Sequence, residues 1–289
     1  MKQYKTGYVA ITGKPNVGKS TLINAVVKRK VAITSYKPQT TRNKIKALYN
    51  DTNSSIMFID TPGYHKSMNK LDDHLNSEIK SSYKSVDCIL LLIDPTRELD
   101  DEDYSVIKMI SNYNINNVIL VITKKDISKK NIDSYIENVK SKINIANEIH
   151  ISSNMQETVS ELLTLIKTKL PSSTKPLENI EDDDNFVISE LIREQIIFNT
   201  KKEIPYSTLV YVENKKYEND IFEISAVIVV EKESQKPIII GAGGQMIKKI
   251  GTLARKELLN IYACRINLKL FVKVEKDWRK NEKFLSISN

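Results

Sequence analysis

The sequence predicts two domains: an α/β domain, with a mostly parallel sheet covered by helices on both faces, and a smaller α+β domain after it. Two observations predict this order. Short apolar runs alternate with helical patterns through the first half, and the order of helices and strands changes after an acidic segment. The length of 289 residues fits this division, because one domain usually takes about 100–200 residues.

The first domain is expected to alternate buried strands with helices. Continuously apolar runs are typical of strands that are buried on both faces of a parallel sheet. The apolar runs are Tyr8–Thr12, Ser55–Asp60, Cys88–Asp94, Val118–Thr123 and Glu148–Ser152. The helical stretches are Thr21–Lys28, Asp101–Asn112, Ile132–Ile143 and Thr158–Leu170. Alternation of this kind predicts a doubly wound sheet.

A domain boundary is predicted after the last of these helices. The helical pattern stops at Leu170, before Pro171, and a polar segment follows. Residues Glu178 to Asp184 include five carboxylates and no basic side chain, a composition that is most often a solvated linker. We therefore predict a first domain over residues 1–171, an acidic linker over 172–185 and a second domain over 186–289.

The second domain is expected to follow the order α-β-β-α-α-β. Phe186–Lys202 has the pattern of an amphipathic helix. Two strands, Ser207–Glu213 and Ile221–Val230, follow it and are joined by a polar turn. Helical stretches then flank the glycine-rich residues Gly241–Gly244, and a last strand covers Arg265–Glu275.

Composition argues against a disordered or membrane-spanning chain. Hydrophobic residues make up 40% and charged residues 28% of the sequence, which is enough to build packed cores. No apolar stretch approaches the ~18–20 residues that span a bilayer, and the N-terminus carries no signal-peptide core, so we expect a cytosolic protein. Cys88 and Cys264 lie far apart, and Cys88 is expected to be a buried, reduced thiol. The net charge of +8 permits a polyanionic partner.

A phosphate-binding loop is predicted at Gly13–Ser20, which matches the pattern G-x-x-x-x-G-K-[ST]. It follows the strand that ends at Thr12 and precedes the helix that starts at Thr21, as the mechanism requires. The glycines let backbone N–H groups surround the phosphates, and the helix N-terminus adds partial positive charge. We expect Lys19 to bridge the β- and γ-phosphates and Ser20 to ligate Mg²⁺. The expected nucleotide contacts in this region are Gly13, Asn16, Val17, Gly18, Lys19, Ser20 and Thr21.

Two later motifs favour guanine over adenine. An Asp-Thr-Pro-Gly motif starts at Asp60 at the end of a strand; Asp60 is expected to reach Mg²⁺ through a water, and the Gly63 N–H to sense the γ-phosphate. Thr123, Lys124 and Asp126 end another strand. The Asp126 carboxylate can accept hydrogen bonds from N1–H and the 2-amino group of guanine, donors that adenine lacks. Three motifs in this order, each after a strand, predict a site for GTP/GDP and Mg²⁺.

A switch loop is predicted between the first two motifs. Residues Gln39–Arg42 lie in a polar segment without clear periodicity. Such a loop needs a threonine whose hydroxyl caps Mg²⁺ only while the γ-phosphate is present. We choose Thr41 for this role, with Thr40 second.

These motifs resemble the guanine-nucleotide boxes of the TrmE–Era branch of bacterial P-loop GTPases. Within that branch, Ile33–Ser35 leading into Lys37–Arg42 is similar to the Era family. The resemblance implies a fifth box near Ser152, whose loop backbone contacts the guanine O6, so Ser152 and Ser153 join the expected nucleotide contacts. The usual Ser-Ala of this box is Ser-Ser here, and Thr123 stands where asparagine is usual.

The residue that orients the attacking water is not given by a motif. Tyr64 stands where Ras-type enzymes carry a glutamine, and the resemblance implies that the water is positioned otherwise. His65 could act as a base, although a histidine beside a switch loop is more often a solvent-facing bystander. We expect Lys19, Thr41 and Gly63 to support catalysis, with a slow intrinsic rate that a partner raises.

The glycine-rich turn predicts RNA binding by the second domain. A Gly-x-x-Gly turn between two helices beside a sheet is the backbone-clamping loop of a KH domain, which grips about four nucleotides of single-stranded RNA. The element order suits the prokaryotic KH type. Residues Lys232 to Lys283 include 13 Lys and Arg against 5 Asp and Glu, a net of +8. The expected RNA-binding residues are Gly241, Ala242, Gly243, Gly244, Lys248, Lys249, Arg255 and Lys256.

The neighbours of this turn also resemble the C-terminal domain of the Era family. The resemblance includes Ile204–Ser207 and Val272–Val274. Ala242 and Gly243 stand where a basic residue is common in that family, and we expect the downstream lysines and arginine to supply the charge. Trp278 and Tyr262 could stack on bases, although apolar packing is the more common role for both side chains.

The resemblance implies a GTP-dependent switch that binds the 3′ end of 16S rRNA during assembly of the small ribosomal subunit. It implies a monomer, and peripheral contact with the inner face of the cell membrane, for which the sequence shows no anchor. Three rivals stay open. The first is a GTPase of tRNA modification, although that branch lacks a Gly-x-x-Gly module after the GTPase domain. The second is a P-loop ATPase, which fails if Asp126→Asn abolishes GTP binding while ATP never binds. The third is a GTP-gated RNA-binding protein with negligible hydrolysis, which Tyr64 would fit.

Overall fold

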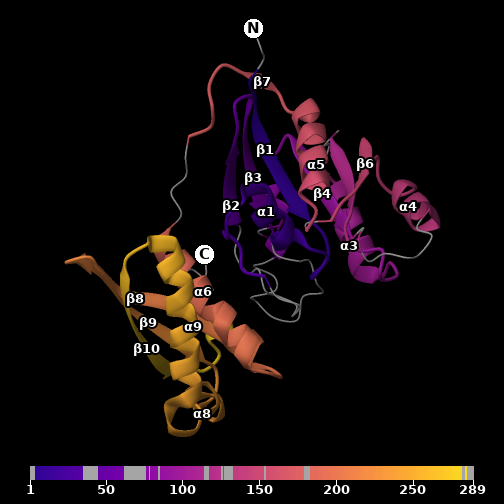
Figure 1. Ribbon diagram of the computed structural model, residues 1–289. Coiled ribbons are helices and arrows are strands. Elements are labelled where there is room, and N and C mark those ends of the chain that lie inside the picture. The colour runs from indigo at the N-terminus through magenta and orange to yellow at the C-terminus, as the bar shows by residue number, and fades with distance from the viewer. Residues whose placement is uncertain are drawn as a thin grey trace. The chain divides into compact units, whose positions relative to one another are not determined.

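The structure of the protein is a computed structural model. It describes residues 4–34, 45–61, 76–77, 79–83, 85–113, 117–124, 126, 133–152, 154–178, 183–281 and 284. The chain divides into two compact units that part between residues 180 and 181 (Figure 1). Each unit has its own sheet. None of the described helices is long and apolar enough to cross a membrane.

The sheet of the first unit has the strand order β2-β3-β1-β4-β5-β6. Among the described strands of this path, neighbours run parallel except β2, which is antiparallel to β3. Strand β7 pairs antiparallel with the start of β1. The bounds are β1 Tyr4–Thr12, β2 Ile45–Asn50, β3 Ser54–Asp60, β4 Cys88–Ile93, β5 Val118–Ile122, β6 Asn147–His150 and β7 Ser172–Ser173. The predicted mostly parallel sheet is confirmed.

The strands of this sheet are buried on both faces. Every residue of β4 and β5 is buried, as their continuous apolar runs predict. Alternate residues such as Ile89 and Leu120 share one hydrophobic core with helices α3 and α4. Their neighbours Leu90 and Val121 are fully buried too and point to the other face, because side chains alternate along a strand. The helices are α1 Lys19–Val27, α3 Asp101–Ser111, α4 Asp133–Lys140 and α5 Gln156–Lys169.

Two features of the first unit differ from the prediction. The sequence does not predict β2, because it is an edge strand in which Ile45 and Ala47 are buried while Lys46 is exposed, so it has no continuous apolar run. The predicted linker starts at residue 172, yet Ser172–Ser173 pair with β1. Serines carry no strand signal of their own, and this pairing depends on the main chain of a distant partner.

The second unit packs helices against one face of a small sheet. Strand β9 lies in its centre, with β8 antiparallel on one side and β10 parallel on the other. Ile188 and Ile192 of α6 meet Ile250 and Leu258 of α9 in the core. The bounds are α6 Asp184–Asn199, α7 Ile204–Ser207, β8 Leu209–Glu218, β9 Ile221–Val230, α8 Lys236–Ile240, α9 Gln245–Tyr262 and β10 Arg265–Val274. The order α-β-β-α-α-β is confirmed, with the short helix α7 added.

The turn between β8 and β9 is shorter than the sequence predicts. Residues 214–220 form the predicted polar turn, but β8 runs to Glu218 and pairs with β9 over most of this segment. The two turn residues, Asn219 and Asp220, have positive φ angles of 52° and 59°, which two-residue hairpins need and which Asn and Asp tolerate. Exposed side chains such as Lys216 suit an edge strand as well as a turn.

Candidate nucleotide and nucleic-acid sites

The phosphate loop joins the end of β1 to the start of α1. Three of its residues have positive φ angles: Gly13 with 147°, Asn16 with 64° and Gly18 with 105°. A Cβ atom on Gly13 would lie 2.5 Å from the carbonyl oxygen of Leu92, so glycine is required there for space as well as for conformation. This backbone curvature is the kind that turns successive N–H groups toward a bound anion.

The predicted catalytic lysine lies across this loop. Lys19 is 5% exposed, and its Nζ donates hydrogen bonds to the carbonyl oxygens of Gly13 at 3.0 Å and Lys14 at 2.9 Å. Burial lowers the pKa of Lys19 to about 8; the Asp60 charge opposes that shift and the Arg97 charge adds to it. The carbonyl oxygens of the loop therefore hold the Lys19 ammonium close to where phosphates would bind.

Two hard oxygen ligands converge beside the loop. The Ser20 Oγ donates to Asp60 Oδ2 at 2.8 Å, and Asp60 is fully buried at the end of β3. Strand register explains the approach, because Asp60 pairs with Ile11 of β1, and the Thr61 hydroxyl also donates to the Ile11 carbonyl oxygen at 2.9 Å. A hydroxyl and a carboxylate are suitable ligands for Mg²⁺, which favours oxygen donors. These residues therefore fit the predicted metal role.

The guanine motif is fastened to the phosphate loop. The Thr123 hydroxyl lies 2.8 Å from the Val17 carbonyl oxygen and 3.0 Å from the Ile93 carbonyl oxygen, and it can donate to either. Lys124 has a positive φ of 57°. Asp126 is exposed, as a carboxylate that must meet a base in solution should be. Threonine at position 123 thus makes the connection to the phosphate loop although the family's usual residue is asparagine.

The fifth box is supported by a threonine that sequence reasoning missed. Ser152 is buried, and its backbone N–H donates to Thr158 Oγ1 at 3.0 Å, while that hydroxyl donates to the Ser152 carbonyl oxygen at 2.9 Å. Because the Ser152 N–H is engaged inside the protein, a contact with guanine O6 falls to the residues after it. A threonine in the first turn of a helix, close after a strand, was the available signal.

Several predicted site residues lie outside the described residues. They are Gln39, Thr40, Thr41, Arg42, Gly63, Tyr64, His65 and Ser153. The structure therefore brings together the loop, Ser20, Asp60 and Thr123, and leaves the switch residues as predictions. Thr21 lies in the first turn of α1 and is exposed.

The predicted RNA-clamping turn joins α8 to α9. Gly241, Gly243 and Gly244 have positive φ angles of 74°, 55° and 79°. A Cβ atom on Gly241 would lie 2.7 Å from both the N and the Cβ of Met246, whereas one on Gly243 or Gly244 would meet no described atom within 4 Å. Ala242 between them is exposed. The turn therefore exposes backbone on its outer side, where a sugar-phosphate chain can approach.

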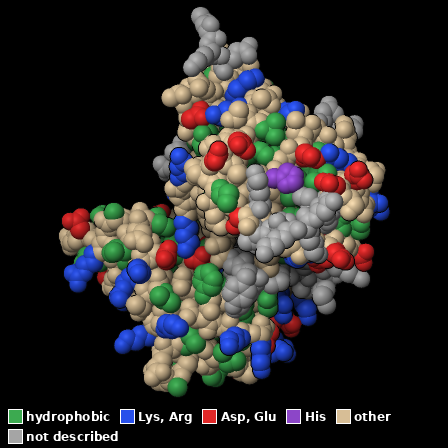
Figure 2. Space-filling view, turned by 45° about the vertical axis from the view of Figure 1, so that its right-hand side comes forward, with side chains coloured by type: hydrophobic (Ala, Val, Ile, Leu, Met, Phe, Trp, Pro, Cys, Tyr) green, Lys and Arg blue, Asp and Glu red, His purple; other side chains and the backbone are tan. Residues whose placement is uncertain are grey.

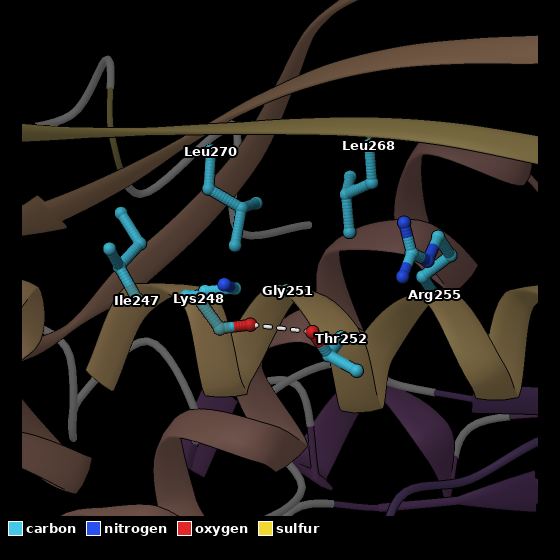
Figure 3. Close-up of a pocket in the computed structure, with 7 residues that line it drawn as sticks. All are labelled: Ile247, Lys248, Gly251, Thr252, Arg255, Leu268 and Leu270. Atoms are coloured by element: carbon cyan, nitrogen blue, oxygen red, sulfur yellow. Dashed lines mark hydrogen bonds between the residues drawn. The ribbon is translucent and has the colours of Figure 1, made fainter. Parts of the chain in front are cut away.

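A groove of about 330 Å³ lies between α9 and β10 (Figure 3). Lys248 and Arg255 carry its positive charge, and both are among the predicted RNA-binding residues. Leu268 and Leu270 of β10 supply an apolar wall that sequence reasoning missed. The lining residues are Ile247, Lys248, Gly251, Thr252, Arg255, Leu268 and Leu270. The groove thus combines cations with apolar surface, which is what a single-stranded nucleic acid needs for its phosphates and bases.

The other predicted lysines face elsewhere. Lys249 and Lys256 are exposed on α9 but do not line the groove. Lys248, Gly251, Thr252 and Arg255 follow the i, i+3, i+4, i+7 spacing of one helix face. Lys249, the residue after Lys248, lies off that face, and Lys256, four residues after Thr252, lies at its margin. Figure 2 shows Lys and Arg side chains spread over the visible surface of the second unit.

The two aromatic candidates for base stacking both pack within the second unit, although Tyr262 is only partly buried. Trp278 is fully buried, and its Nε1 donates to the Ser207 carbonyl oxygen at 2.9 Å. Tyr262 packs edge-to-face on Phe222 with ring centroids 5.0 Å apart, and its hydroxyl donates to Asp184 at 2.8 Å. The packing interpretation of both side chains is confirmed. Cys88 is buried as predicted, and burial raises its pKa to about 12.

Comparisons with known proteins match both units. Residues 8–124 match the family described as 50S ribosome-binding GTPase, and residues 203–279 match the KH domain family. GTPase Era of Ureaplasma urealyticum is 45% identical over 284 residues, which cover 96% of this chain and 95% of the relative. GTPase Era of Thermotoga maritima is 41% identical over 284 residues, which cover 96% of this chain and 94% of the relative.

Two solved structures of Era have the same fold along almost the whole chain. A variant of Aquifex aeolicus Era bound to GDP and AlF4⁻ is 33% identical, with 99% of both chains covered and a TM-score of 0.92. Era in complex with MgGDPNP and nucleotides 1506–1542 of 16S ribosomal RNA is also 33% identical, with 99% of both chains covered and a TM-score of 0.93. The chain therefore belongs to the Era family of GTPases, in which a KH domain follows the GTPase domain.

Proposed function

We propose that this GTPase couples GTP binding and hydrolysis to the capture of single-stranded RNA, the 3′ end of 16S rRNA, in assembly of the small ribosomal subunit. The groove between α9 and β10, lined by two cations and an apolar wall, carries the proposal. The glycine-rich turn that precedes α9 exposes its backbone, as RNA clamping by a KH domain requires. The Era protein solved with nucleotides 1506–1542 of 16S rRNA supports this choice of RNA.

The nucleotide half of the proposal assigns roles to the first unit. Lys19 neutralises charge on the β- and γ-phosphates. Ser20 directly and Asp60 through a water would hold Mg²⁺, which when bound would stabilise negative charge in the transition state. The Asp126 carboxylate accepts hydrogen bonds from N1–H and the 2-amino group of guanine. Thr41 and the Gly63 N–H sense the γ-phosphate.

Slow hydrolysis suits a switch that waits for its RNA. In place of the glutamine that orients water in Ras-type enzymes, this chain carries Tyr64. A phenol has no amide to hold the water from two sides, so we propose a low intrinsic rate. RNA or a ribosomal partner then raises it, and hydrolysis acts as a release timer.

In the RNA-binding part of the proposal, the single-stranded RNA lies along α9. The open outer side of Gly243 and Gly244 accepts the sugar-phosphate backbone, and Lys248 and Arg255 pair with phosphates. Leu268 and Leu270 contact the flat faces of bases. Gly251 contributes by having no side chain, because a Cβ there would already touch Leu270 at 3.4 Å and would fill part of the groove.

GTP hydrolysis at fixed Mg²⁺, with and without a short RNA that copies the 16S 3′ end, tests the proposal. We expect stimulation by the RNA in the native chain and its loss in Gly244→Asp, which adds a carboxylate to the clamping turn. Asn219→Asp is the matched control, because it adds the same charge at another positive-φ position of the second unit. Equal stimulation in both variants would reject RNA capture by this turn, and an RNA without effect on the native chain would reject the coupling.

Place of action and assembly state are further parts of the proposal. Binding to the small ribosomal subunit places the protein in the cytoplasm, and we propose that it acts as a monomer. Peripheral contact with the inner face of the cell membrane is proposed on the family resemblance alone. Sedimentation of the purified chain tests whether it is a monomer, and flotation with anionic vesicles tests the membrane contact.

A further inference from the structure

A buried carboxylate after β4 joins two parts of the nucleotide site. Asp94 is 2% exposed at its side chain. Its Oδ1 accepts hydrogen bonds from the N–H of Thr96 at 3.0 Å and from the Thr96 hydroxyl at 2.6 Å. Its Oδ2 accepts from the Nζ of Lys124 at 2.5 Å and faces the Nε of Arg97 at 3.2 Å. One oxygen therefore binds both the lysine of the guanine motif and an arginine that no motif contains.

Arg97 continues this connection to the phosphate loop. Its Nη2 donates to the carbonyl oxygen of Pro15 at 3.2 Å. The described peptide bonds include no cis bond, so the N–H of Asn16 points opposite to the Pro15 carbonyl, away from Arg97. Asn16 is in the left-handed conformation, which allows the chain to turn there. Arg97 thus fixes the orientation of a peptide whose N–H belongs to the anion-binding curve of the loop.

We propose that Asp94 and Arg97 are positioning residues that couple the guanine motif to the phosphate loop. The path runs from Lys124 through Asp94 and Arg97 to the Pro15 carbonyl. A second path, from the Thr123 hydroxyl to the Val17 carbonyl, ends two residues later in the same loop. When a bound guanine orders Lys124 and Thr123, it therefore also orders the Pro15–Asn16 peptide of the phosphate loop. Recognition of guanine thus strengthens binding of the phosphates.

A simple surface ion pair would not have this effect. Arg97 is 38% exposed at its side chain, and an exposed ion pair alone contributes little. What distinguishes Arg97 is that separate nitrogens of its guanidinium bind Asp94 and Pro15, a geometry that the single nitrogen of lysine cannot reproduce. Lys14 is bound in the same region by Asp100 and lies 3.6 Å from Asp103, so the segment after β4 holds the loop at two adjacent residues.

The first test compares the affinities of fluorescent GDP for the native chain and three variants. Arg97→Ala is expected to weaken binding about fivefold to tenfold, the effect of losing one charge-assisted hydrogen bond that is partly exposed. Arg97→Lys is expected to lose as much GDP affinity as Arg97→Ala. A GDP affinity fully restored by lysine would show that the positive charge is sufficient, and would overturn a positioning role for the guanidinium. Lys108→Ala is the control, because it removes an exposed cation on α3; a loss in Arg97→Ala no larger than in this control would overturn the proposal.

The second test is a double-mutant cycle with Lys124. If the two cations act through Asp94, Arg97→Ala should weaken GDP binding by less than about twofold in the Lys124→Ala background. The same fold loss in both backgrounds would overturn the coupling. The proposal presupposes that the loop binds a guanine nucleotide, and the native chain reports on that separately: no GDP binding by it would reject the proposed function, whereas normal GDP binding with unaffected variants would reject only the role of Asp94 and Arg97.

Discussion

Alanine substitutions in the glycine turn of the second unit should separate strain from steric conflict. Gly241 combines φ 74° with ψ 169°, a region that is essentially restricted to glycine. A Cβ there would also lie 2.7 Å from two atoms of Met246. Gly244 has a similar φ of 79°, but its ψ of 9° is left-handed and its Cβ would meet open space.

The magnitudes follow from these differences. Gly244→Ala should cost about 1 kcal/mol, the penalty of a left-handed alanine. Gly241→Ala should cost about 3 kcal/mol, because a conflict with the main chain of α9 adds about 2 kcal/mol of overpacking. If RNA requires this turn conformation, the two variants should lose about fivefold and over a hundredfold in RNA affinity.

Fluorescence anisotropy with a labelled RNA that copies the 16S 3′ end measures these affinities in the full chain. Circular dichroism should show that α9 persists in both variants at the temperature of the assay. Nucleotide affinity is an internal control, because the turn lies in the unit that does not carry the phosphate loop. An RNA affinity in Gly241→Ala equal to that in Gly244→Ala would refute the reasoning, since neither the stricter backbone region of Gly241 nor its conflict with Met246 would then matter.

The further predictions concern Lys19, Thr123 and Trp278. Because the pKa of Lys19 is lowered to about 8 from 10.5, its contribution to the free energy of unfolding should rise between about pH 8 and 10.5 in the nucleotide-free chain, and Lys19→Met should remove that rise in urea titrations. GDP affinity of the native chain should fall above about pH 8, with proton uptake on binding in calorimetry. Thr123→Val should weaken GDP binding about tenfold, because the Val17 carbonyl loses its donor, whereas Thr123→Asn, with an amide donor, should stay within about threefold in the same titration. Trp278→Phe should lower stability by about 2 kcal/mol, through the lost bond to Ser207 and the space left behind, as a thermal melt will show.

Much of the first unit could be predicted because its signals are local. The continuous apolar runs identify β4 and β5, and the phosphate loop is fixed by a motif between a strand and a helix. Ser20, Asp60 and Thr123 lie together because the carboxyl ends of parallel strands meet at one edge of the sheet. Asp94 follows β4 at this same edge, so its position could have been predicted.

What could not be predicted depends on partners far along the chain. Arg97 contacts Pro15 across 82 residues, and no local pattern marks it. The pairing of Ser172–Ser173 with β1 likewise uses main-chain groups of two serines. The charge count of the second unit suggested four basic residues for RNA, but only Lys248 and Arg255 of these line the groove. Composition measures how much charge is present, whereas helix periodicity decides where it points.

The pairing of β7 with β1 determines where the linker to the second unit begins. Strand β7 lies opposite Tyr4 and Lys5, at the amino end of β1, whereas the phosphate loop starts after Thr12 at its other end. At ~3.3 Å per residue the two points are about 26 Å apart. The linker to the second unit therefore leaves the sheet at the end of β1 opposite the phosphate loop. A change at the phosphate loop therefore has the length of β1 to cross before it reaches the start of this linker.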